Sequence, residues 1–373
     1  MRADIVFFDA GGGHRAAANA LQLASEQSGR NWQIRLVNLQ ETLDRMDIFR
    51  MVTRIRMQDI YNHLLRKGWT LGSEYLIGPM HAIIWLNHSK MVRMLQDYWK
   101  EDPPDLLISV VPNFNRALHE SYRKSVPNGK MVTILTDMAD YPPHFWIEPR
   151  KTQEQWFICG TERAKQQAKE LGHSDDRIYQ TSGMILHPRF YEKLDIDRDA
   201  ERKKLGLRTD LPVGLVLFGG YGSTRMLDIA RKVSDAKLPI QLIFICGKNE
   251  KLRRKLQKMN LSFPAVIEGF TSEVPYYMQL ADFFIGKPGP GSISEALQMN
   301  LPVIVERNSW TLPQERFNTD WVQEKKAGLV VENFDGIVQV LQNMQLEELR
   351  ANAAALNNRA VFEIPEILEK IIG

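Results

Sequence analysis

The chain has 373 residues, of which 44% are hydrophobic and 25% are charged. This composition is typical of a globular protein with room for two domains. The formal net charge is +3, from 48 basic and 45 acidic residues, which is too small to indicate a nucleic-acid-binding protein but leaves room for a local basic patch. The two cysteines, Cys159 and Cys246, each end a strand-like run, so we expect buried free thiols and a reducing compartment.

From the sequence we predict neither a targeting segment nor a membrane-spanning one. The first nine residues lack a basic region followed by an extended apolar core, so no signal peptide is expected. The longest apolar stretch, 75–86, is interrupted by Gly78, Pro79 and His81 and is shorter than the roughly 20 residues that span a bilayer. We therefore expect a cytoplasmic protein that does not cross a membrane.

A glycine-rich turn follows the first predicted strand. Residues 5–8 are apolar and are followed by Asp9, a run of glycines at 11–13, His14 and an alanine-rich helix over about 14–27. Such turns lie at the carboxyl end of a parallel strand, where open α/β sheets bind ligands. The glycine spacing differs from the dinucleotide fingerprint, which argues against NAD. His14 is a candidate general base, because the glycines clear space beside it; the alternative is a solvated residue in the first turn of a helix.

The next predicted strands are 33–37, 106–111, 132–136 and 155–159, with helices such as 162–171 between them. This alternation predicts a parallel sheet with crossover helices. Asp137 directly follows the strand over 132–136, so it too is expected at a carboxyl end.

The pattern changes between 44 and 100, where basic residues alternate with methionines and large apolar residues. Such a basic amphipathic helix is typical of a membrane-surface segment, although an ordinary helix that packs its apolar stripe on the sheet fits the pattern equally well. The residues that carry the membrane hypothesis are Arg45, Arg50, Arg54, Arg56, Arg66 and Lys67, followed by Trp69, Trp85 and Trp99.

A charged run over 191–211 ends at Pro212, and the predicted domain boundary lies between 205 and 206. Beyond it the strand and helix alternation resumes, with strands at 214–218, 242–246 and 265–267 and a helix over 274–280. A second glycine-rich turn, containing Gly219, Gly220 and Gly222, follows the first of these strands.

The stretch 282–302 is the strongest local signal of a ligand site. A short apolar strand at 283–285 leads into a turn rich in glycine and proline, and a helix opens at Ser292 or the residue before it. The unpaired backbone N–H groups of a helix start attract an anion. Glu295 is expected on the exposed side of this helix, where a carboxylate can accept hydrogen bonds from ribose hydroxyls. Together these features suggest a nucleotide diphosphate; the alternative is an ordinary strand-to-helix turn with a solvated Glu295.

Several motifs, taken in order, resemble a known family over almost the whole chain. They are 9–16 (DAGGGHRA), 104–110 (PDLLISV), 135–138 (LTDM) with the downstream Trp146, 172–188, 286–296 (GKPGPGSISEA) and 313–318 (PQERFN). These motifs resemble the monogalactosyldiacylglycerol synthase and processive diacylglycerol glucosyltransferase group of glycosyltransferase family 28. That group is related to the lipid-linked N-acetylglucosaminyltransferase of peptidoglycan synthesis.

The resemblance implies an α/β protein with the GT-B fold, in which two Rossmann-like domains face a cleft. It implies an acceptor domain over 1–205 with a membrane-surface segment near 44–100, a nucleotide-sugar domain over 206–345, and a C-terminal helix within 346–373 that crosses back to the first domain. It also implies inversion at the anomeric carbon by direct displacement, with a UDP-sugar as co-substrate and no cofactor or metal.

The resemblance further assigns roles to residues. His14 would be the catalytic base, and Asp137 the second candidate base or a partner that orients His14. Glu295 would bind the ribose, Phe270 the uracil, and Gln314 and Glu315 the sugar hydroxyls. The phosphates would lie beside Gly222, Ser223, Gly289, Pro290, Gly291 and Ser292. The acceptor side would contain Gly12, Gly13, Pro112 and Trp146.

The chain also departs from the family pattern. Leu312 and Pro313 stand where the family has proline and glycine before Gln314, Trp310 is unexpected in the sugar-binding loop, and the segment 137–146 is long.

The leading hypothesis is an inverting UDP-hexose transferase that acts on diacylglycerol, peripherally bound to the anionic inner face of the cell membrane. The alternatives are the same chemistry with UDP-N-acetylglucosamine or another acceptor, a UDP-sugar 2-epimerase, and a non-catalytic sugar-nucleotide-binding protein. The sequence leaves the hexose, the acceptor, processivity and the oligomeric state open.

Overall fold

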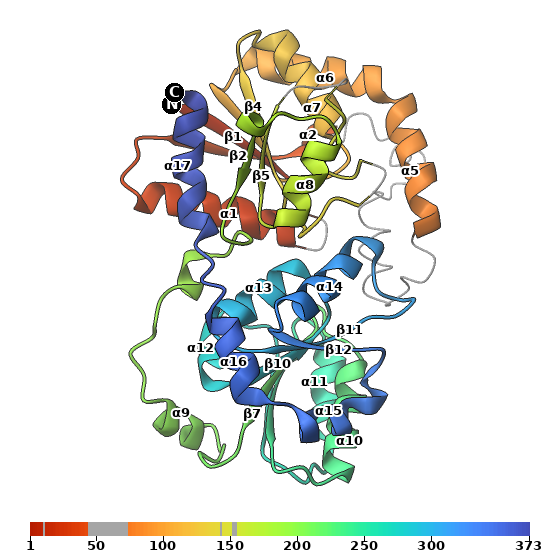
Figure 1. The fold of residues 1–373 in the computed structure, drawn as a ribbon, viewed down its shortest axis with the longest axis vertical. Helices are drawn as coiled ribbons and strands as arrows, with labels where there is room; N and C mark the ends of the chain where they lie inside the picture. Colours follow the sequence, from red (N-terminus) through yellow and green to blue (C-terminus); the bar gives the residue numbers. More distant parts are fainter. Residues whose placement is uncertain (10–11, 44–73, 142–143, 151–154) are drawn as a thin grey trace. The chain divides into compact units, whose positions relative to one another are not determined.

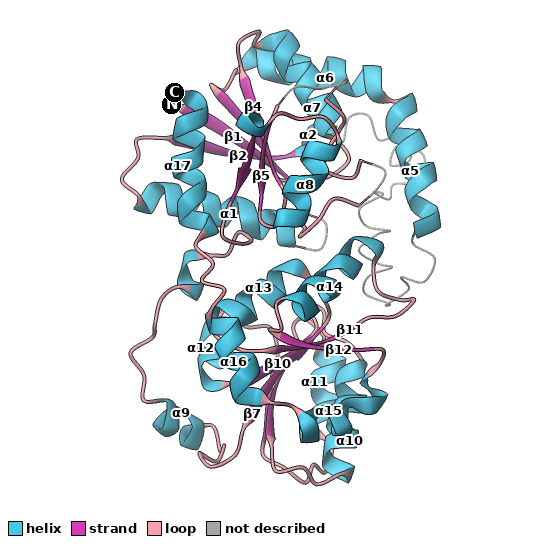
Figure 2. Cartoon of the chain, in the orientation of Figure 1, coloured by secondary structure: helices cyan, strands magenta, loops and turns pink. Residues whose placement is uncertain are grey.

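The structure is a computed structural model that describes residues 1–9, 12–43, 74–141, 144–150 and 155–373 (Figure 1). It divides into two compact units. The first consists of Met1–Pro188, Leu312–Gln314 and Asn358–Gly373, and the second of Arg189–Thr311 and Glu315–Asn357. The chain therefore first passes between units at 188/189, upstream of the 205/206 boundary that the charged run suggested. Each unit is an α/β domain with a parallel sheet (Figure 2).

The sheet of the first unit has the strand order β2-β1-β3-β4-β5-β6, and all of its neighbouring strands are parallel. Its strands are β1 (Arg2–Phe7), β2 (Gln33–Asn38), β3 (Leu106–Ser109), β4 (Lys130–Ile134), β5 (Trp156–Cys159) and β6 (Ile178–Gln180). The helices of this unit are α1 (Gly13–Gln27), α2 (Leu39–Leu43), α5 (Glu74–Leu86), α6 (His88–Glu101), α7 (Asn115–Ser125), α8 (Glu162–Glu170) and α17 (Ala360–Ile372). Strands such as β3 are buried along their whole length, as expected for a parallel sheet covered on both faces.

The sheet of the second unit has the order β12-β11-β10-β7-β8-β9, again with parallel neighbours. Its strands are β7 (Val213–Leu217), β8 (Gln241–Ile245), β9 (Ala265–Glu268), β10 (Phe283–Gly286), β11 (Val303–Glu306) and β12 (Gly328–Val331). Its helices are α9 (Arg198–Lys204), α10 (Arg225–Asp235), α11 (Glu250–Gln257), α12 (Val274–Leu280), α13 (Pro290–Gln298), α14 (Arg316–Glu324), α15 (Ile337–Asn343) and α16 (Leu346–Ala354). The core between this sheet and its helices is apolar and includes Phe244, Phe283 and Ile304.

The predicted membrane-surface segment is only partly described, because 44–73 lies outside the described residues. Within the described part, α6 is an ordinary amphipathic helix: Met91, Leu95 and Trp99 are buried in the core of the first unit. The prediction that Trp99 is an interfacial aromatic was therefore wrong, since its ring packs against Tyr122 at a centroid distance of 6.3 Å. Trp85 on α5, in contrast, is 69% exposed.

The C-terminal part of the chain is divided between the units. Helix α16 belongs to the second unit and α17 to the first, where α17 packs against α1 (Figure 1). Arg30 donates to both carboxylate oxygens of Glu369 at 2.7 and 3.0 Å. Lys130 Nζ donates to the carbonyl oxygens of Ile371 and Ile372 at 2.7 and 2.8 Å, which satisfies carbonyl groups that have no partner within the helix.

Both cysteines are buried free thiols, as predicted. Burial raises the pKa of Cys159 to about 12 and that of Cys246 to about 11, so both are inert at physiological pH.

Among the described residues, no helix combines the length and the apolar character that crossing a bilayer requires.

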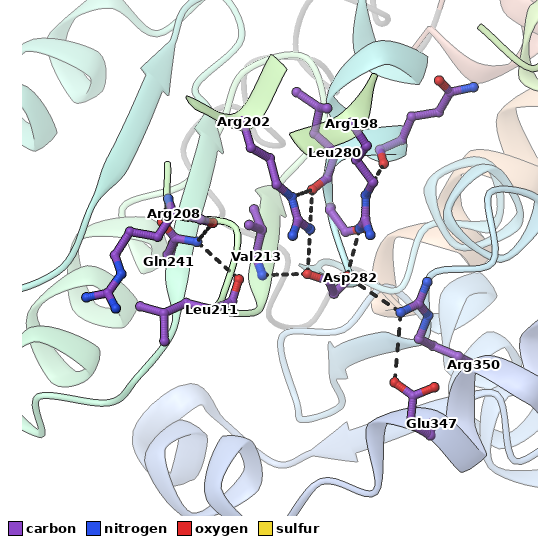
Figure 3. A network of polar contacts seen from close by, with 12 residues as sticks. Arg198, Arg202, Arg208, Leu211, Val213, Gln241, Leu280, Asp282, Glu347 and Arg350 are labelled. Carbon is purple, nitrogen blue, oxygen red and sulfur yellow. Dashed lines mark hydrogen bonds and ion pairs between the residues drawn. The ribbon is translucent and has the colours of Figure 1, made fainter. Parts of the chain in front are cut away.

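Asp282, which directly precedes β10, is the centre of a buried ionic network (Figure 3). One carboxylate oxygen accepts from Arg202 Nη2 at 2.6 Å and from the backbone N–H of Val213 at 2.8 Å. The other accepts from Arg198 Nη2 at 2.7 Å and lies 3.5 Å from Arg350 Nη1. Desolvation alone raises the pKa of Asp282, but these donors and positive charges outweigh it and hold the pKa below its usual value. The network therefore joins α9 and α16 to the beginning of β7 and β10.

We expect Asp282→Asn to destabilise the second unit by about 3–5 kcal/mol, because it leaves the buried Arg202 without its countercharge. The matched control is Asp210→Asn, which removes an ion pair with Arg208 in which both side chains are exposed, and which is expected to cost much less than Asp282→Asn because water screens an exposed pair. Urea denaturation followed by circular dichroism measures both. Because the pKa of Asp282 is lower in the folded state, its contribution to the free energy of unfolding is fully present above the unfolded-state pKa. That contribution is lost as the pH falls through the folded-state pKa. Equal stabilities of the two variants would contradict this account.

Candidate active site

The strand order of each sheet creates one position at which a ligand site is expected. In the first unit β1 and β3 are neighbours, but the chain continues from β1 outward to β2 and from β3 in the opposite direction to β4. In the second unit β7 and β10 have the same relation. Open α/β sheets bind ligands outside the carboxyl ends of strands at such a reversal. The three predicted glycine-rich turns follow β1, β7 and β10, so each lies at one of these two positions.

His14 lies in the first turn of α1, directly after the turn that follows β1. Gly12 precedes the helix with a left-handed φ of 84°, and within the part of the chain that is described, a Cβ added at Gly12 or Gly13 would meet no atom within 4 Å. His14 is half-buried, with Nδ1 3.1 Å from Thr136 Oγ1. Desolvation lowers the pKa of His14 to about 4, against a hydrogen bond with the Val110 carbonyl that raises it. The imidazole is therefore neutral at physiological pH, the form in which it can accept a proton.

The structure brings three of the predicted site residues together. The ring of Trp146 lies 5.8 Å from that of His14, between centroids, and the Trp146 indole N–H donates to Asp137 Oδ2 at 2.8 Å. Asp137 is thus connected to His14 through the tryptophan ring. Pro112 is buried next to Asn113, whose backbone N–H donates to the Phe145 carbonyl at 2.6 Å, so the turn after β3 is fixed against the segment that carries Trp146.

In the second unit, the turns after β7 and β8 pack backbone against backbone. Gly222 and Gly247 have φ values of 60° and 58°, and a Cβ at Gly247 would lie 2.3 Å from the Gly220 carbonyl oxygen. Only glycine tolerates both the conformation and the close approach. Ser223, predicted beside the phosphates, accepts from the backbone N–H of Arg225 at 3.2 Å at the start of α10.

Phe270, predicted to contact uracil, follows β9 and is 68% exposed. Lys248 Nζ lies 5.3 Å from the centroid of its ring, a cation–π distance. The exposed ring is available for stacking on a planar base.

The helix α13 begins at Pro290, after Gly289, which has no side chain to cap the first N–H groups. Ser292 uses its hydroxyl to donate to the Gly289 carbonyl at 3.2 Å, and Gly291 is exposed. The N–H groups of this first turn carry the positive end of the helix dipole, which favours an anion.

Lys287 is a candidate donor-binding residue that the sequence reasoning missed. Its Cε lies 3.6 Å from the position of a Cβ on Gly219 and 3.3 Å from that of a Cβ on Gly289, so its side chain spans the turns that follow β7 and β10. Its Nζ lies 2.9 Å from Glu315 Oε1. The signal in the sequence was a lysine between a buried strand and a glycine-rich helix start, a position from which a cation reaches a phosphate.

Glu315, predicted to hold sugar hydroxyls, is buried and paired with Lys287, whereas its neighbour Gln314 is half-buried in the same short 3-10 helix. Glu295 was expected on the exposed side of α13, and this was wrong: it is half-buried. Desolvation raises its pKa to about 7, partly offset by the positive charge of Arg189. A carboxyl group with a pKa so far from its usual range, near a helix start that favours an anion, is typical of a functional site.

A parallel α/β protein with two such units, each with a glycine-rich helix start at its strand-order reversal, has the architecture of a GT-B glycosyltransferase. Solved structures confirm this fold. MurG of Acinetobacter baumannii is similar with a TM-score of 0.63 at 13% identity, covering 99% of both chains. The calicheamicin glycosyltransferase CalG4 gives 0.61 at 14% identity, covering 100% of this chain and 98% of the other. UDP-GlcNAc 2-epimerase of Neisseria meningitidis gives 0.60 at 14% identity, covering 100% and 99%.

Comparisons of sequence narrow the class further. Residues 215–371 match the glycosyltransferase family 28 C-terminal domain. A probable monogalactosyldiacylglycerol synthase of rice (Oryza sativa subsp. japonica) is 30% identical over 87% of this chain and 69% of its own length. Monogalactosyldiacylglycerol synthase 1 of Arabidopsis thaliana is 27% identical over 99% and 70%; both relatives are named as chloroplastic. The chain belongs to the monogalactosyldiacylglycerol synthase group of glycosyltransferase family 28.

Proposed function

We propose that this protein transfers a hexose from a UDP-sugar to a hydroxyl group of a lipid, diacylglycerol, with inversion at the anomeric carbon, to form a β-glycosyl glycerolipid. Two observations carry the proposal, one in each unit: the neutral, desolvated imidazole of His14 at the strand-order reversal of the first unit, and the glycine-rich start of α13 at that of the second. The names of the monogalactosyldiacylglycerol synthases support diacylglycerol as the acceptor.

The proposed reaction is a single displacement. The acceptor oxygen forms a bond to the anomeric carbon, the bond from that carbon to the diphosphate oxygen breaks, and the acceptor proton passes to His14. The low pKa of His14 keeps the imidazole unprotonated and available at the start of the reaction, and its nearness to the reacting hydroxyl would supply general-base catalysis.

The residues of the second unit would bind the donor and stabilise the departing UDP. The N–H groups at the start of α13 and the ammonium of Lys287 would receive the negative charge that develops on the diphosphate. Glu295 would accept hydrogen bonds from the ribose hydroxyls, and Phe270 would stack on the uracil. Gln314, which belongs to the first unit, would contact the sugar, and Glu315 of the second unit would hold Lys287 in place.

A radiolabelled UDP-sugar assay with diacylglycerol tests the role of His14. We expect His14→Ala to lower kcat by about 10²–10⁴-fold, because general-base catalysis is lost, while UDP binding by calorimetry is unchanged. The matched control is His119→Ala on α7, which should keep wild-type activity. Activity that survives intact in His14→Ala would remove His14 from this role, and activity that requires an added metal would contradict the proposed metal-independent displacement.

The pKa of Glu295 gives the donor site a pH dependence. Its pKa of about 7 means that the carboxylate is lost as the pH falls from 8 to 6, so UDP-sugar affinity should fall with it, because a protonated carboxyl accepts fewer hydrogen bonds. Glu295→Gln should bind roughly 10-fold more weakly at pH 8 and show no such pH dependence. Calorimetric titrations measure both, with Glu324→Gln, at an exposed position of α14, as control. A wild-type affinity that does not change with pH would reject the ribose role.

The exposed face of α5 supports peripheral contact with a membrane. Ile83, Trp85 and Leu86 are 54%, 69% and 73% exposed at the end of this helix, and the exposed Lys90 and Arg93 follow on α6. Large apolar side chains beside basic residues are typical of segments that insert into an anionic lipid surface. We propose that this surface brings the enzyme to its lipid acceptor, on the cytoplasmic side of the membrane.

Flotation with vesicles tests this contact. Wild-type protein should float with vesicles that contain phosphatidylglycerol and less with neutral ones, because both burial and charge contribute. The double variant Trp85→Ser, Leu86→Ser should lose most of the binding, whereas Trp310→Ser, which removes a 45% exposed tryptophan of the second unit, should not. Neutralising Arg50, Arg54 and Arg56, which lie outside the described residues, should also weaken binding to the anionic vesicles. Undiminished flotation of the double variant would dismiss the role of α5.

A further inference from the structure

Trp146, whose ring faces His14, is held at every one of its hydrogen-bonding groups. Its backbone N–H donates to Asp140 Oδ1 at 2.6 Å, its indole N–H to Asp137 Oδ2 at 2.8 Å, and its carbonyl accepts from Asn115 Nδ2 at 2.9 Å. The side chain is 1% exposed. A buried tryptophan fixed in this way cannot change rotamer without breaking a hydrogen bond, so it forms a rigid wall beside the imidazole.

Asp140 is itself fixed by helix α8. Gln167 accepts from the backbone N–H of Asp140 with Oε1 and donates to its carbonyl with Nε2, both at 2.8 Å. Both the N–H and the carbonyl of Asp140 are thereby fixed, which orients its carboxylate towards Trp146. Burial raises the pKa of Asp140 to about 7 against the backbone N–H groups of Trp146 and Ile147, which lower it. A buried carboxyl group that does not pair with a basic side chain in these contacts is costly to keep.

The same segment of chain contacts His14 from a second direction. Thr136, next to Asp137, places its hydroxyl oxygen 3.1 Å from His14 Nδ1. The hydroxyl can donate or accept. If Thr136 accepts, the hydrogen is on Nδ1 and Nε2 keeps a lone pair; if it donates, Nε2 carries the hydrogen and cannot act as a base. The imidazole also bonds the Val110 carbonyl, which can only accept and therefore favours a hydrogen on the nitrogen that faces it. The proposed reaction thus depends on which tautomer these two contacts select.

We propose that Asp140 is a positioning residue for His14. By holding the backbone of Trp146 it keeps Trp146, and through it Asp137 and the adjoining Thr136, in place beside the imidazole, so that Thr136 accepts the Nδ1 hydrogen and Nε2 presents its lone pair to the acceptor hydroxyl. Asp137 acts in the same way, through the indole N–H. This inference rests on the proposed function and names the residues that prepare its base.

Nuclear magnetic resonance of protein with ¹⁵N-labelled histidine tests the tautomer directly, with the His14 signals identified by their loss in His14→Gln. Wild-type His14 should carry its hydrogen on Nδ1 and remain neutral down to pH 5. Thr136→Val, which removes the hydroxyl at nearly constant volume, should shift the population towards the Nε2–H tautomer. A wild-type His14 with its hydrogen on Nε2, or a Thr136→Val spectrum identical to wild type, would overturn the proposal.

Kinetics of full-length variants separate positioning from stability. Asp140→Ala should lower kcat by about 10²-fold, as expected for a displaced catalytic group, while leaving the KM for UDP-sugar nearly unchanged, and should broaden or shift the His14 signals. Asp140→Asn keeps an oxygen that can accept from Trp146 and should restore both. Asp4→Ala removes another buried carboxylate of the same unit, which pairs with Arg35, and controls for lost stability: it should leave kcat and the His14 signals unchanged.

The outcomes also distinguish this inference from the proposed function. A loss of kcat in Asp140→Ala with unchanged His14 signals would reject the positioning role while leaving His14 as the base. Full activity of His14→Ala would reject His14 as the catalytic base, while the tautomer measurement would still decide whether Asp140 positions the imidazole. If Asp140→Ala does not fold, Gln167→Leu, which removes the two hydrogen bonds that fix the Asp140 peptide, must show the same change of the His14 signals, and a wild-type spectrum for it would overturn the proposal.

Discussion

In a sheet whose strands are all parallel, the carboxyl ends of all strands lie at the same edge. That edge is left uncovered only where the connections that follow two neighbouring strands lead to opposite sides of the sheet. This constraint places the candidate site of each unit. Between β1 and β3 it leaves room for the glycines before His14, and between β7 and β10 it leaves room for the start of α13. The glycines serve two different needs. Gly247 is required where the turn after β8 approaches the backbone at Gly220, whereas a Cβ at Gly12, Gly13 or Gly291 would meet no described atom within 4 Å, so those glycines leave space for a ligand to reach the N–H groups.

Desolvation acts on every ionisable group near these edges, and the local charges decide its result. His14 stays neutral because burial opposes protonation and its polar partners are a hydroxyl and a carbonyl. Glu295 is brought to the edge of neutrality, since the charge of Arg189 only partly offsets its burial. Asp282, at the other end of β10, is also buried but stays ionised because several arginines surround it. The same desolvation therefore leaves His14 neutral and raises the pKa of Glu295 towards neutrality, whereas Asp282 stays ionised and holds its network together.

Much of the architecture was predictable from the sequence. The central strands are continuous apolar runs followed by glycine turns, and predictions such as 242–246 and 283–285 agree with β8 and β10 to within a residue at each end. The strands β6, β11 and β12 were not predicted. β6 has only three residues, too few to show a period, whereas β11 and β12 are as long as the predicted β3 and β10 and were missed despite their apolar runs. The prediction that Trp99 is interfacial failed because an amphipathic pattern shows that a helix has an apolar face but not what covers it.

The sequence by itself determined the alternation of buried strands and helices, the glycine-rich helix starts and the family, because each of these depends on residues that are close together in the chain. Only the tertiary structure decided that Lys287 lies near two turns and that Glu295 is half-buried. It alone also showed that Asp137 and Asp140 accept hydrogen bonds from Trp146 beside His14. These facts depend on desolvation and on contacts between residues such as Asp140 and Gln167, which lie far apart in the sequence. A local pattern contains no information about such neighbours, since burial and hydrogen bonding are fixed only when the sheet brings its loops to one edge.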